Sequence, residues 1–135
     1  MSESRVVSTA AEKERGDAAV VNVGSGLGVA PKASAPVYCA TKAALPSATR
    51  SLRYQMQDSG ACVRFVDVVL PRVDTDMTRG RGTRKASPPA VADEVVRALR
   101  RGRDEVWVGR ARVLRRLMRV SPGLGHRVLR GTASD

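Results

Sequence analysis

Residues 18–26 read AAVVNVGSG, a mainly apolar run that is closed by Gly-Ser-Gly. A short apolar run without polar alternation predicts a strand that is buried on both faces of a parallel sheet. Parallel neighbours are joined by a crossover connection, which is usually a helix. The chain that follows is therefore expected to supply a loop, a helix and a second strand.

The segments after residue 26 are consistent with this order. Residues 35–57 are expected to form a helix, because apolar and long side chains recur there at helical spacings. Residues 62–71, CVRFVDVVLP, predict a second strand, residues 90–102 a further helix and residues 105–109 a third strand. This order predicts an α/β fold, a partial doubly wound, Rossmann-like parallel sheet of about three strands with flanking helices.

The composition divides the chain into three parts. Residues 1–17 are expected to be a polar N-terminal tail or frayed helix, residues 18–109 hold the predicted sheet, and residues 110–135 are a basic C-terminal tail. No apolar signal segment and no run long enough to cross a membrane is found in the sequence. The two cysteines, Cys39 and Cys62, do not suggest a disulfide scaffold or a zinc site. We therefore expect a cytoplasmic protein without a metal ion.

The net charge of +11 is concentrated in the C-terminal third. Residues 97–130 contain eleven arginines but only two acidic residues, Asp104 and Glu105. Such a surplus indicates either the codon usage of a GC-rich genome or a functional basic surface, and the composition does not decide between them.

Tyr38 and Lys42 lie one helical turn apart in the predicted helix, so their side chains share a face. This spacing alone also fits an ordinary amphipathic helix. An ammonium group beside a phenol stabilises the phenolate, which would let Tyr38 give or take a proton near neutral pH. Ser25 ends the preceding strand, at the crevice where α/β proteins bind ligands. Its hydroxyl could orient a substrate carbonyl or alcohol beside the phenol.

The combination of these residues resembles the short-chain dehydrogenase/reductase family. The resemblance rests on Ser25, on Tyr38-x-x-x-Lys42 and on Val73 and Thr75 in the segment LPRVDTDM after the second strand. It covers about residues 17–109, which are similar to the second half of that fold. Residues 18–109 are therefore expected to be the C-terminal half of a Rossmann-like dehydrogenase domain.

The resemblance implies an NAD- or NADP-dependent oxidoreductase that interconverts a small-molecule alcohol and a carbonyl. The implied catalytic residues are Ser25, Tyr38 and Lys42. The implied cofactor-binding residues are Tyr38, Lys42, Val73 and Thr75, with the lysine on the nicotinamide ribose. No metal site is implied.

The glycine-rich phosphate loop of the family is not found before residue 18, so we expect an enzyme fragment. The strand in residues 18–26 is then expected to become an exposed edge, which favours association. Pro46 is expected to kink the helix just after Lys42.

An alternative is a non-catalytic interaction module that associates with itself or with a full-length relative. The helix at residues 35–57 resembles one that such enzymes use for subunit packing, so a homo-oligomer is possible. The basic residues 110–130 have three interpretations: closure over the substrate site, binding to anionic lipid, and binding to nucleic acid. Because no aromatic residues alternate with these arginines, no specific nucleic-acid partner is expected.

Overall fold

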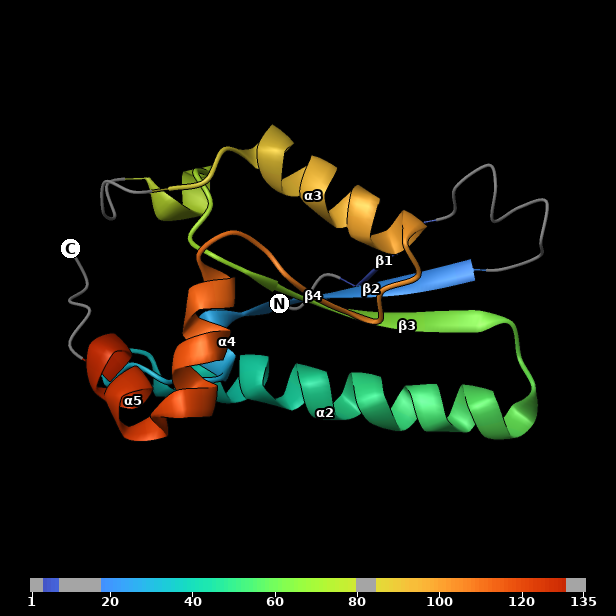
Figure 1. The fold of residues 1–135 in the computed structure, drawn as a ribbon, viewed down its shortest axis with the longest axis horizontal. Helices are drawn as coiled ribbons and strands as arrows, with labels where there is room; N and C mark the ends of the chain where they lie inside the picture. The colour runs from blue at the N-terminus through green and yellow to red at the C-terminus, as the bar shows by residue number, and fades with distance from the viewer. Residues whose placement is uncertain (1–3, 8–17, 80–84, 131–135) are drawn as a thin grey trace.

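The structure, a computed structural model, describes residues 4–7, 18–79 and 85–130 (Figure 1). These residues form one four-stranded sheet in the order β1-β2-β3-β4. β2, β3 and β4 run parallel, and β1 runs antiparallel to β2 at the edge. The strands are β1 (Ser4–Val7), β2 (Ala18–Ser25), β3 (Val63–Leu70) and β4 (Glu105–Trp107). The predicted α/β fold with three parallel strands and flanking helices is confirmed.

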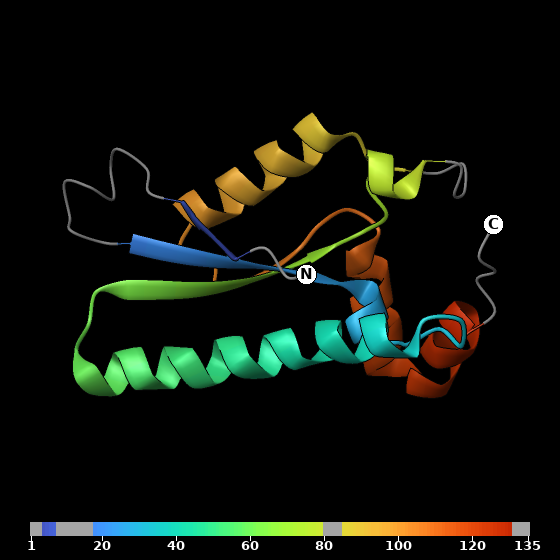
Figure 2. The same cartoon turned by 180° about the vertical axis from the view of Figure 1, so that it is seen from behind.

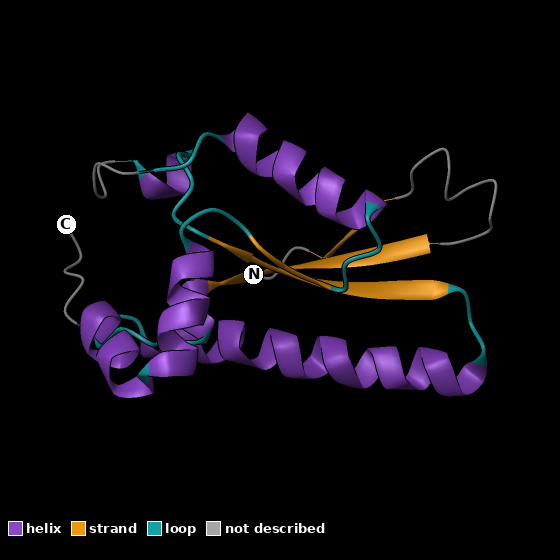
Figure 3. Ribbon diagram, in the orientation of Figure 1, coloured by secondary structure: helices purple, strands orange, loops and turns teal. Residues whose placement is uncertain are grey.

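Two helices cover opposite faces of the sheet, and two more lie at the end toward which β2 and β3 run (Figures 1 and 2). α2 covers one face and α3 the other, while α4 and α5 pack together at the carboxyl edge (Figure 3). The helices are α2 (Pro36–Ser59), α3 (Pro88–Arg100), α4 (Ala111–Val120) and α5 (Pro122–Arg130), with short 3-10 helices η1 (Gly26–Gly28) and η2 (Asp76–Thr78). Among the described residues, no helix combines the length and the apolar character needed to cross a bilayer.

Apolar side chains fill the space between the sheet and α3. Strand side chains alternate between the two faces, so Val66 and Val68 of β3 share one face with Val21 of β2. These valines pack with Val91 and Leu99 of α3. Each fully buried aliphatic side chain of this kind contributes about 1.5–3 kcal/mol to folding.

The opposite face of the sheet, which α2 covers, is more polar. Asn22 of β2 donates a hydrogen bond of 2.8 Å from Nδ2 to Oγ1 of Thr49, whose side chain is completely buried. Arg53 donates from Nε to the backbone oxygen of Phe65 at 2.7 Å, and so fastens the second half of α2 to β3. One buried and one partly buried hydrogen bond therefore fix the position of α2 on the sheet.

Asp67 of β3 is a buried carboxyl group on this polar face, only 3% exposed. Its Oδ1 atom has no hydrogen-bond partner in the described part of the chain, and it lines a cavity of about 50 Å³ beside Pro46. Burial raises the pKa of Asp67 from 3.8 to about 6. The nearby Glu105 acts in the same direction, and Arg53 and Arg50 act against it.

The structure differs from the sequence-based expectation in residues 1–17. Ser4–Val7 do not form a tail but an antiparallel strand, with Ser4 opposite Asn22 and Val7 opposite Ala19. β2 is therefore paired on both sides, and the expected open edge at β2 is wrong. The physical reason is that the backbone groups of an edge strand can be satisfied by any extended segment, whatever its side-chain pattern. Residues 8–17 lie outside the described residues.

The basic C-terminal segment also holds more structure than expected. α4 ends at Val120, and Pro122 then begins α5, because proline suits the first turn of a helix. Residues 131–135 lie outside the described residues. α2 continues past Pro46 as one helix to Ser59, and Gly60 closes it with a left-handed φ of 67°.

Candidate active site

The candidate site lies at the carboxyl edge of the sheet, where β2 and β3 end together. Ser25, the last residue of β2, is the register partner of Leu70, the last residue of β3. The loop that carries Val73 and Thr75 therefore leaves the sheet next to Ser25. The first turn of α2 lies at the same end of the molecule (Figure 2). In parallel sheets this edge is where ligands bind.

Tyr38 and Lys42 occupy the first two turns of α2. The Tyr38 side chain is partly exposed, at 40%. The Lys42 Nζ atom lies 5.8 Å from the centroid of the Tyr38 ring and donates a hydrogen bond of 2.9 Å to the backbone oxygen of Val23. The ammonium group is therefore held between the phenol and the end of β2, which is the shared face that the four-residue spacing predicts.

Ser25 sits at the start of a tight turn. Its Oγ atom accepts a hydrogen bond of 3.2 Å from the backbone N–H of Leu27 and caps η1. At the end of η1, a Cβ atom on Gly28 would lie 2.6 Å from the carbonyl carbon and oxygen of Lys42. Glycine thus permits η1 to pack directly on the α2 turn that carries Lys42. In the described part of the chain, no hydrogen bond joins Ser25 directly to Tyr38.

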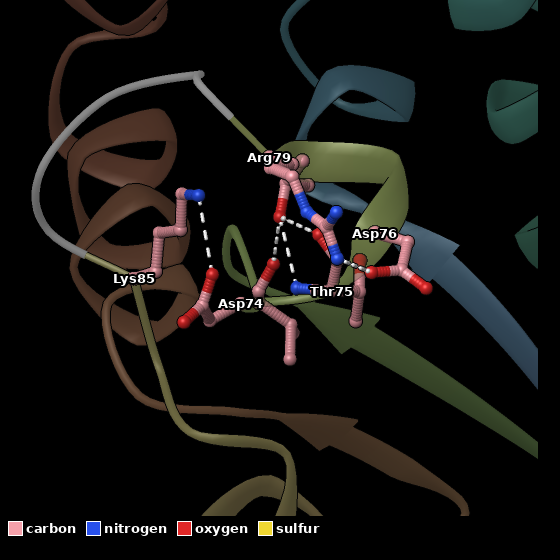
Figure 4. Close-up of polar contacts among 7 residues, drawn as sticks. Asp74, Thr75, Asp76, Arg79 and Lys85 are labelled. Atoms are coloured by element: carbon pink, nitrogen blue, oxygen red, sulfur yellow. Dashed lines mark hydrogen bonds and ion pairs between the residues drawn. The ribbon is translucent and has the colours of Figure 1, made fainter.

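The loop after β3 is held by its own hydrogen bonds (Figure 4). The backbone N–H of Thr75 donates to Oγ1 of Thr78 at 3.1 Å, and the Thr75 hydroxyl accepts from the backbone N–H of Thr78. The Thr78 hydroxyl in turn donates to the backbone oxygen of Val73 at 2.5 Å. The amide N–H and the hydroxyl of Thr75 therefore both have partners within this turn.

The same loop is fastened to the segment that leads into α3. The backbone N–H of Asp74 donates to the backbone oxygen of Ala86 at 2.9 Å, and its Oδ1 atom pairs with Nζ of Lys85 at 3.2 Å. Arg79 forms an ion pair with Asp76 on the exposed side (Figure 4). The start of the loop is consequently a fixed part of the carboxyl edge.

α4 covers the end of β2. The Leu114 Cδ2 atom would lie 2.8 Å from a Cβ atom on Gly26, so these two residues are in close contact next to Ser25. Two ion pairs tie α4 to α3 and to β4: Arg112 with Glu94, and Arg115 with Glu105.

Reasoning from the sequence missed two residues that shape this edge. The close packing of Gly28 on Lys42 has a possible signal, the spacing Gly24-Ser-Gly-Leu-Gly28 at the end of a strand, because repeated glycines often mark a close approach of backbone. The role of Thr78 has no signal in the sequence, because its partners are set by the fold of η2.

The residues at this edge fit the nicotinamide end of an NAD or NADP molecule. The Lys42 ammonium has three N–H donors and uses one for the backbone oxygen of Val23, so two remain for the hydroxyl groups of a ribose. The pyrophosphate end has no matching feature: in the described part of the chain no glycine-rich turn leads directly from a strand into an α-helix, since the glycines after β2 form the 3-10 helix η1. No group of three or more potential metal ligands occurs among the described side chains either.

Comparison with known proteins finds a family model and two relatives that match this chain. The family model described as short chain dehydrogenase matches residues 3–86, a span that contains Ser25, Tyr38, Lys42, Val73 and Thr75. A curated protein described as uncharacterized oxidoreductase DltE, from Bacillus subtilis (strain 168), is 46% identical over 63 residues. A crystal structure of a short chain dehydrogenase from Burkholderia cenocepacia J2315 in complex with NADP is similar over 86% of this chain, with a TM-score of 0.76 and 27% identity.

The chain spans only part of both relatives. The match covers 47% of this chain and 24% of the Bacillus protein, and 48% of the Burkholderia chain.

Proposed function

The chain belongs to the short-chain dehydrogenase family, and from this premise we propose that it is an NAD(P)-dependent oxidoreductase of the cytoplasm. Its reaction interconverts a small-molecule alcohol and a carbonyl compound. Ser25, Tyr38 and Lys42 carry the chemistry, and Tyr38, Lys42, Val73 and Thr75 would hold the nicotinamide end of the cofactor. Because the chain spans 48% of the solved relative, we propose that it represents one half of such an enzyme.

The contact geometry of Lys42 is the observation that carries the proposal. Its ammonium lies beside the Tyr38 ring and is bonded to Val23, two positions before Ser25. A lysine that served only as a solvated helix residue would have no need of a backbone partner on β2.

The chemistry of the three side chains follows from this arrangement. Tyr38 donates its hydroxyl proton to the substrate oxygen during reduction of a carbonyl, and takes the alcohol proton during oxidation. The Lys42 ammonium stabilises the phenolate that this transfer leaves behind. The Ser25 hydroxyl donates a hydrogen bond to the same substrate oxygen and orients it. When bound beside these residues, a nicotinamide cofactor would supply or accept the hydride at the substrate carbon.

The enzyme is preferred to the non-catalytic interaction module, because the matching family model is that of a dehydrogenase and the Bacillus relative is described as an oxidoreductase. The two differ in a simple measurement. Light scattering at micromolar concentration gives a dimer or larger species for the module, whereas the enzyme proposal depends on cofactor binding in any oligomeric state.

The test of the proposed function uses Tyr38→Phe, with Tyr54→Phe as the matched control. Tyr54 is exposed on the same helix, far along the chain from Lys42, and its ring carries the same hydroxyl. Binding of NADH and NADPH is followed by nicotinamide fluorescence, and turnover is followed at 340 nm with a panel of alcohols, aldehydes and ketones.

We expect Tyr38→Phe to lower turnover by about 100-fold or more while cofactor binding persists, since general acid–base groups contribute about 10²–10⁴-fold. Tyr54→Phe should leave both unchanged. Equal turnover in the Tyr38→Phe variant would overturn the proposal.

A further inference from the structure

α4 presents two different faces. One face packs on the molecule: Ala111 is buried, and Leu114 and Met118 are half-buried. The opposite face exposes Val113 by 63% and Val120 by 86%. Since residues three, four and seven apart share a face, the exposed Arg116 lies between these two valines.

α5 repeats this arrangement beside α4. Gly125 is buried, and a Cβ atom there would collide with the Met118 sulfur, so the two helices are in close contact. Leu124 and Val128, four residues apart, are exposed by 47% and 52%. Arg127 and Arg130 are exposed on the same helix. The exposed side chains of α4 and α5 thus mix aliphatic groups with arginines, and we call this set the α4–α5 surface: Val113, Arg116, Arg119, Val120, Leu124, Arg127, Val128 and Arg130.

The charge of this region has one sign. Residues 110–130 contain seven arginines and no acidic residue. Arg112 and Arg115 are used in ion pairs that fix α4 to the rest of the fold. Among the ion pairs of the described residues, none involves an arginine of the α4–α5 surface. The four arginines of the α4–α5 surface are therefore available to bind water or a partner outside the described residues.

We propose that the α4–α5 surface docks on an anionic lipid bilayer, with both helices lying along the interface. Arginines pair with lipid phosphates there, while the exposed valines and leucine insert below the headgroups. Anionic lipids of a cytoplasmic leaflet attract each such cation by about 1 kcal/mol. A basic amphipathic helix is the kind of element that binds in this way.

The aliphatic residues favour a bilayer over nucleic acid. Arginines are sufficient to bind the phosphates of a nucleic acid. A surface that also contacts the bases commonly adds aromatic side chains on which the bases stack. The α4–α5 surface has four exposed aliphatic residues and no aromatic one. A valine that is 86% exposed between arginines gains nothing from a phosphate backbone, but it gains from an acyl layer.

The test is sedimentation of the 135-residue chain with vesicles of phosphatidylcholine, with and without 30 mol% phosphatidylglycerol, at 0.1 M and 0.5 M NaCl. We expect binding to the anionic vesicles only. Part of that binding should survive 0.5 M salt, because insertion of aliphatic side chains is not screened.

A double variant and its matched control locate the surface. Arg116→Gln with Arg119→Gln removes two charges from α4 and should weaken anionic-vesicle binding by about 30-fold. The control, Arg100→Gln with Arg101→Gln, removes the same charge at the C-terminal end of α3, and this end of α3 lies away from α4 and α5 (Figure 1). It should change binding by less than about threefold. Val120→Ser should abolish the salt-resistant fraction. Circular dichroism checks that each variant is folded.

Three results would overturn the proposal. One is equal binding to neutral and anionic vesicles, or to neither. Another is an equal loss in the two double variants, which would leave only unspecific attraction between net charges. The third is salt-sensitive binding to duplex DNA that depends on Arg116 and Arg119, without binding to the anionic vesicles, which would assign the surface to nucleic acid.

Discussion

The Lys42 ammonium donates a hydrogen bond of 2.9 Å to the backbone oxygen of Val23. This contact fastens the helix that carries Tyr38 to the strand that ends in Ser25. The candidate proton donor and the candidate substrate-orienting hydroxyl are thereby held by one lysine, whatever is bound at the site.

Replacing Lys42 tests this link. Lys42→Met keeps the length of the side chain but loses the charged donor, and a hydrogen bond from a charged group contributes about 1.5–3 kcal/mol. We expect the free energy of unfolding to fall by about 1.5–3 kcal/mol in urea denaturation. Lys32→Met makes the same chemical change in the loop before α2 and should cost less than about 0.5 kcal/mol, as surface substitutions usually do. Equal losses in the two variants would show that the Val23 contact does not stabilise the fold.

Gly28 is predicted to accept no side chain. In Gly28→Ala the new methyl group would lie 2.6 Å from the Lys42 carbonyl and 2.9 Å from the Ala43 nitrogen, both backbone atoms that cannot rotate away. Overpacking of this kind costs about 1–3 kcal/mol, which we expect as a loss of stability on thermal or urea unfolding. Gly123→Ala is the matched control, because no atom lies within 4 Å of a methyl group there and the residue is helical. It should stabilise the protein by about 0.5–1 kcal/mol. A Gly28→Ala variant as stable as the parent would contradict the close packing of η1 on α2.

Asp67 predicts a specific pH dependence of stability. Its pKa is raised from 3.8 to about 6 in the folded protein, so folding favours the protonated acid. Its favourable contribution is present below about pH 4 and is lost as the pH rises through 6. Asp67→Asn imitates the protonated acid at every pH. At pH 8 the variant should therefore be more stable than the parent by up to about 3 kcal/mol, and near pH 4 the two should agree.

Urea denaturation of the parent and of Asp67→Asn between pH 4 and pH 8 measures this difference. Asp93→Asn, at an exposed position on α3, makes the same change and should give a difference that hardly varies with pH. A stability difference for Asp67→Asn that is constant over this range would contradict the assignment.

Thr78 is predicted to hold the loop that contains Val73 and Thr75. Thr78→Val keeps the shape of the side chain but removes the hydroxyl that accepts from the Thr75 amide. In hydrogen exchange measured by NMR, we expect the Thr75 amide to exchange at least about fivefold faster, as for a lost bond of about 1 kcal/mol. The Asp74 amide is bonded to Ala86 instead and serves as an internal reference. If both amides change together, the loop depends on something other than the Thr78 hydroxyl.

The parts of the fold with strong local patterns could be predicted from the sequence. β3 follows a valine-rich run, and α2 follows helical spacings with a glycine at its end, so both were found within a few residues of their bounds. β1 was missed because four residues without an apolar pattern form a strand only when β2 offers its edge. α5 was missed because Gly123 and Gly125 lower its helix propensity, and it depends on packing against Met118.

In the candidate site, too, local relations could be predicted from the sequence and long-range contacts could not. The spacing of Tyr38 and Lys42 predicts a shared helix face, because that relation is local. The bond from Lys42 to Val23 and the bonds around Thr78 depend on how distant segments meet, and no local pattern encodes them. The Asp67 Oδ1 atom, which has no hydrogen-bond partner among the described residues, could not be predicted either, because its burial depends on where α2 lies on the sheet.

The arrangement of β1 on β2 also bears on how quickly the sheet forms. Val7 pairs with Ala19 nearby in the chain, whereas Ala18 meets Val63 only after the whole of α2 has been placed. The entropy lost on closing a loop grows with its length, and β-hairpins form in about 1–10 μs. We therefore expect β1 and β2 to pair early and the crossover to β3 to close later. The short edge strand would then act as a template that orders β2 before its parallel partner arrives.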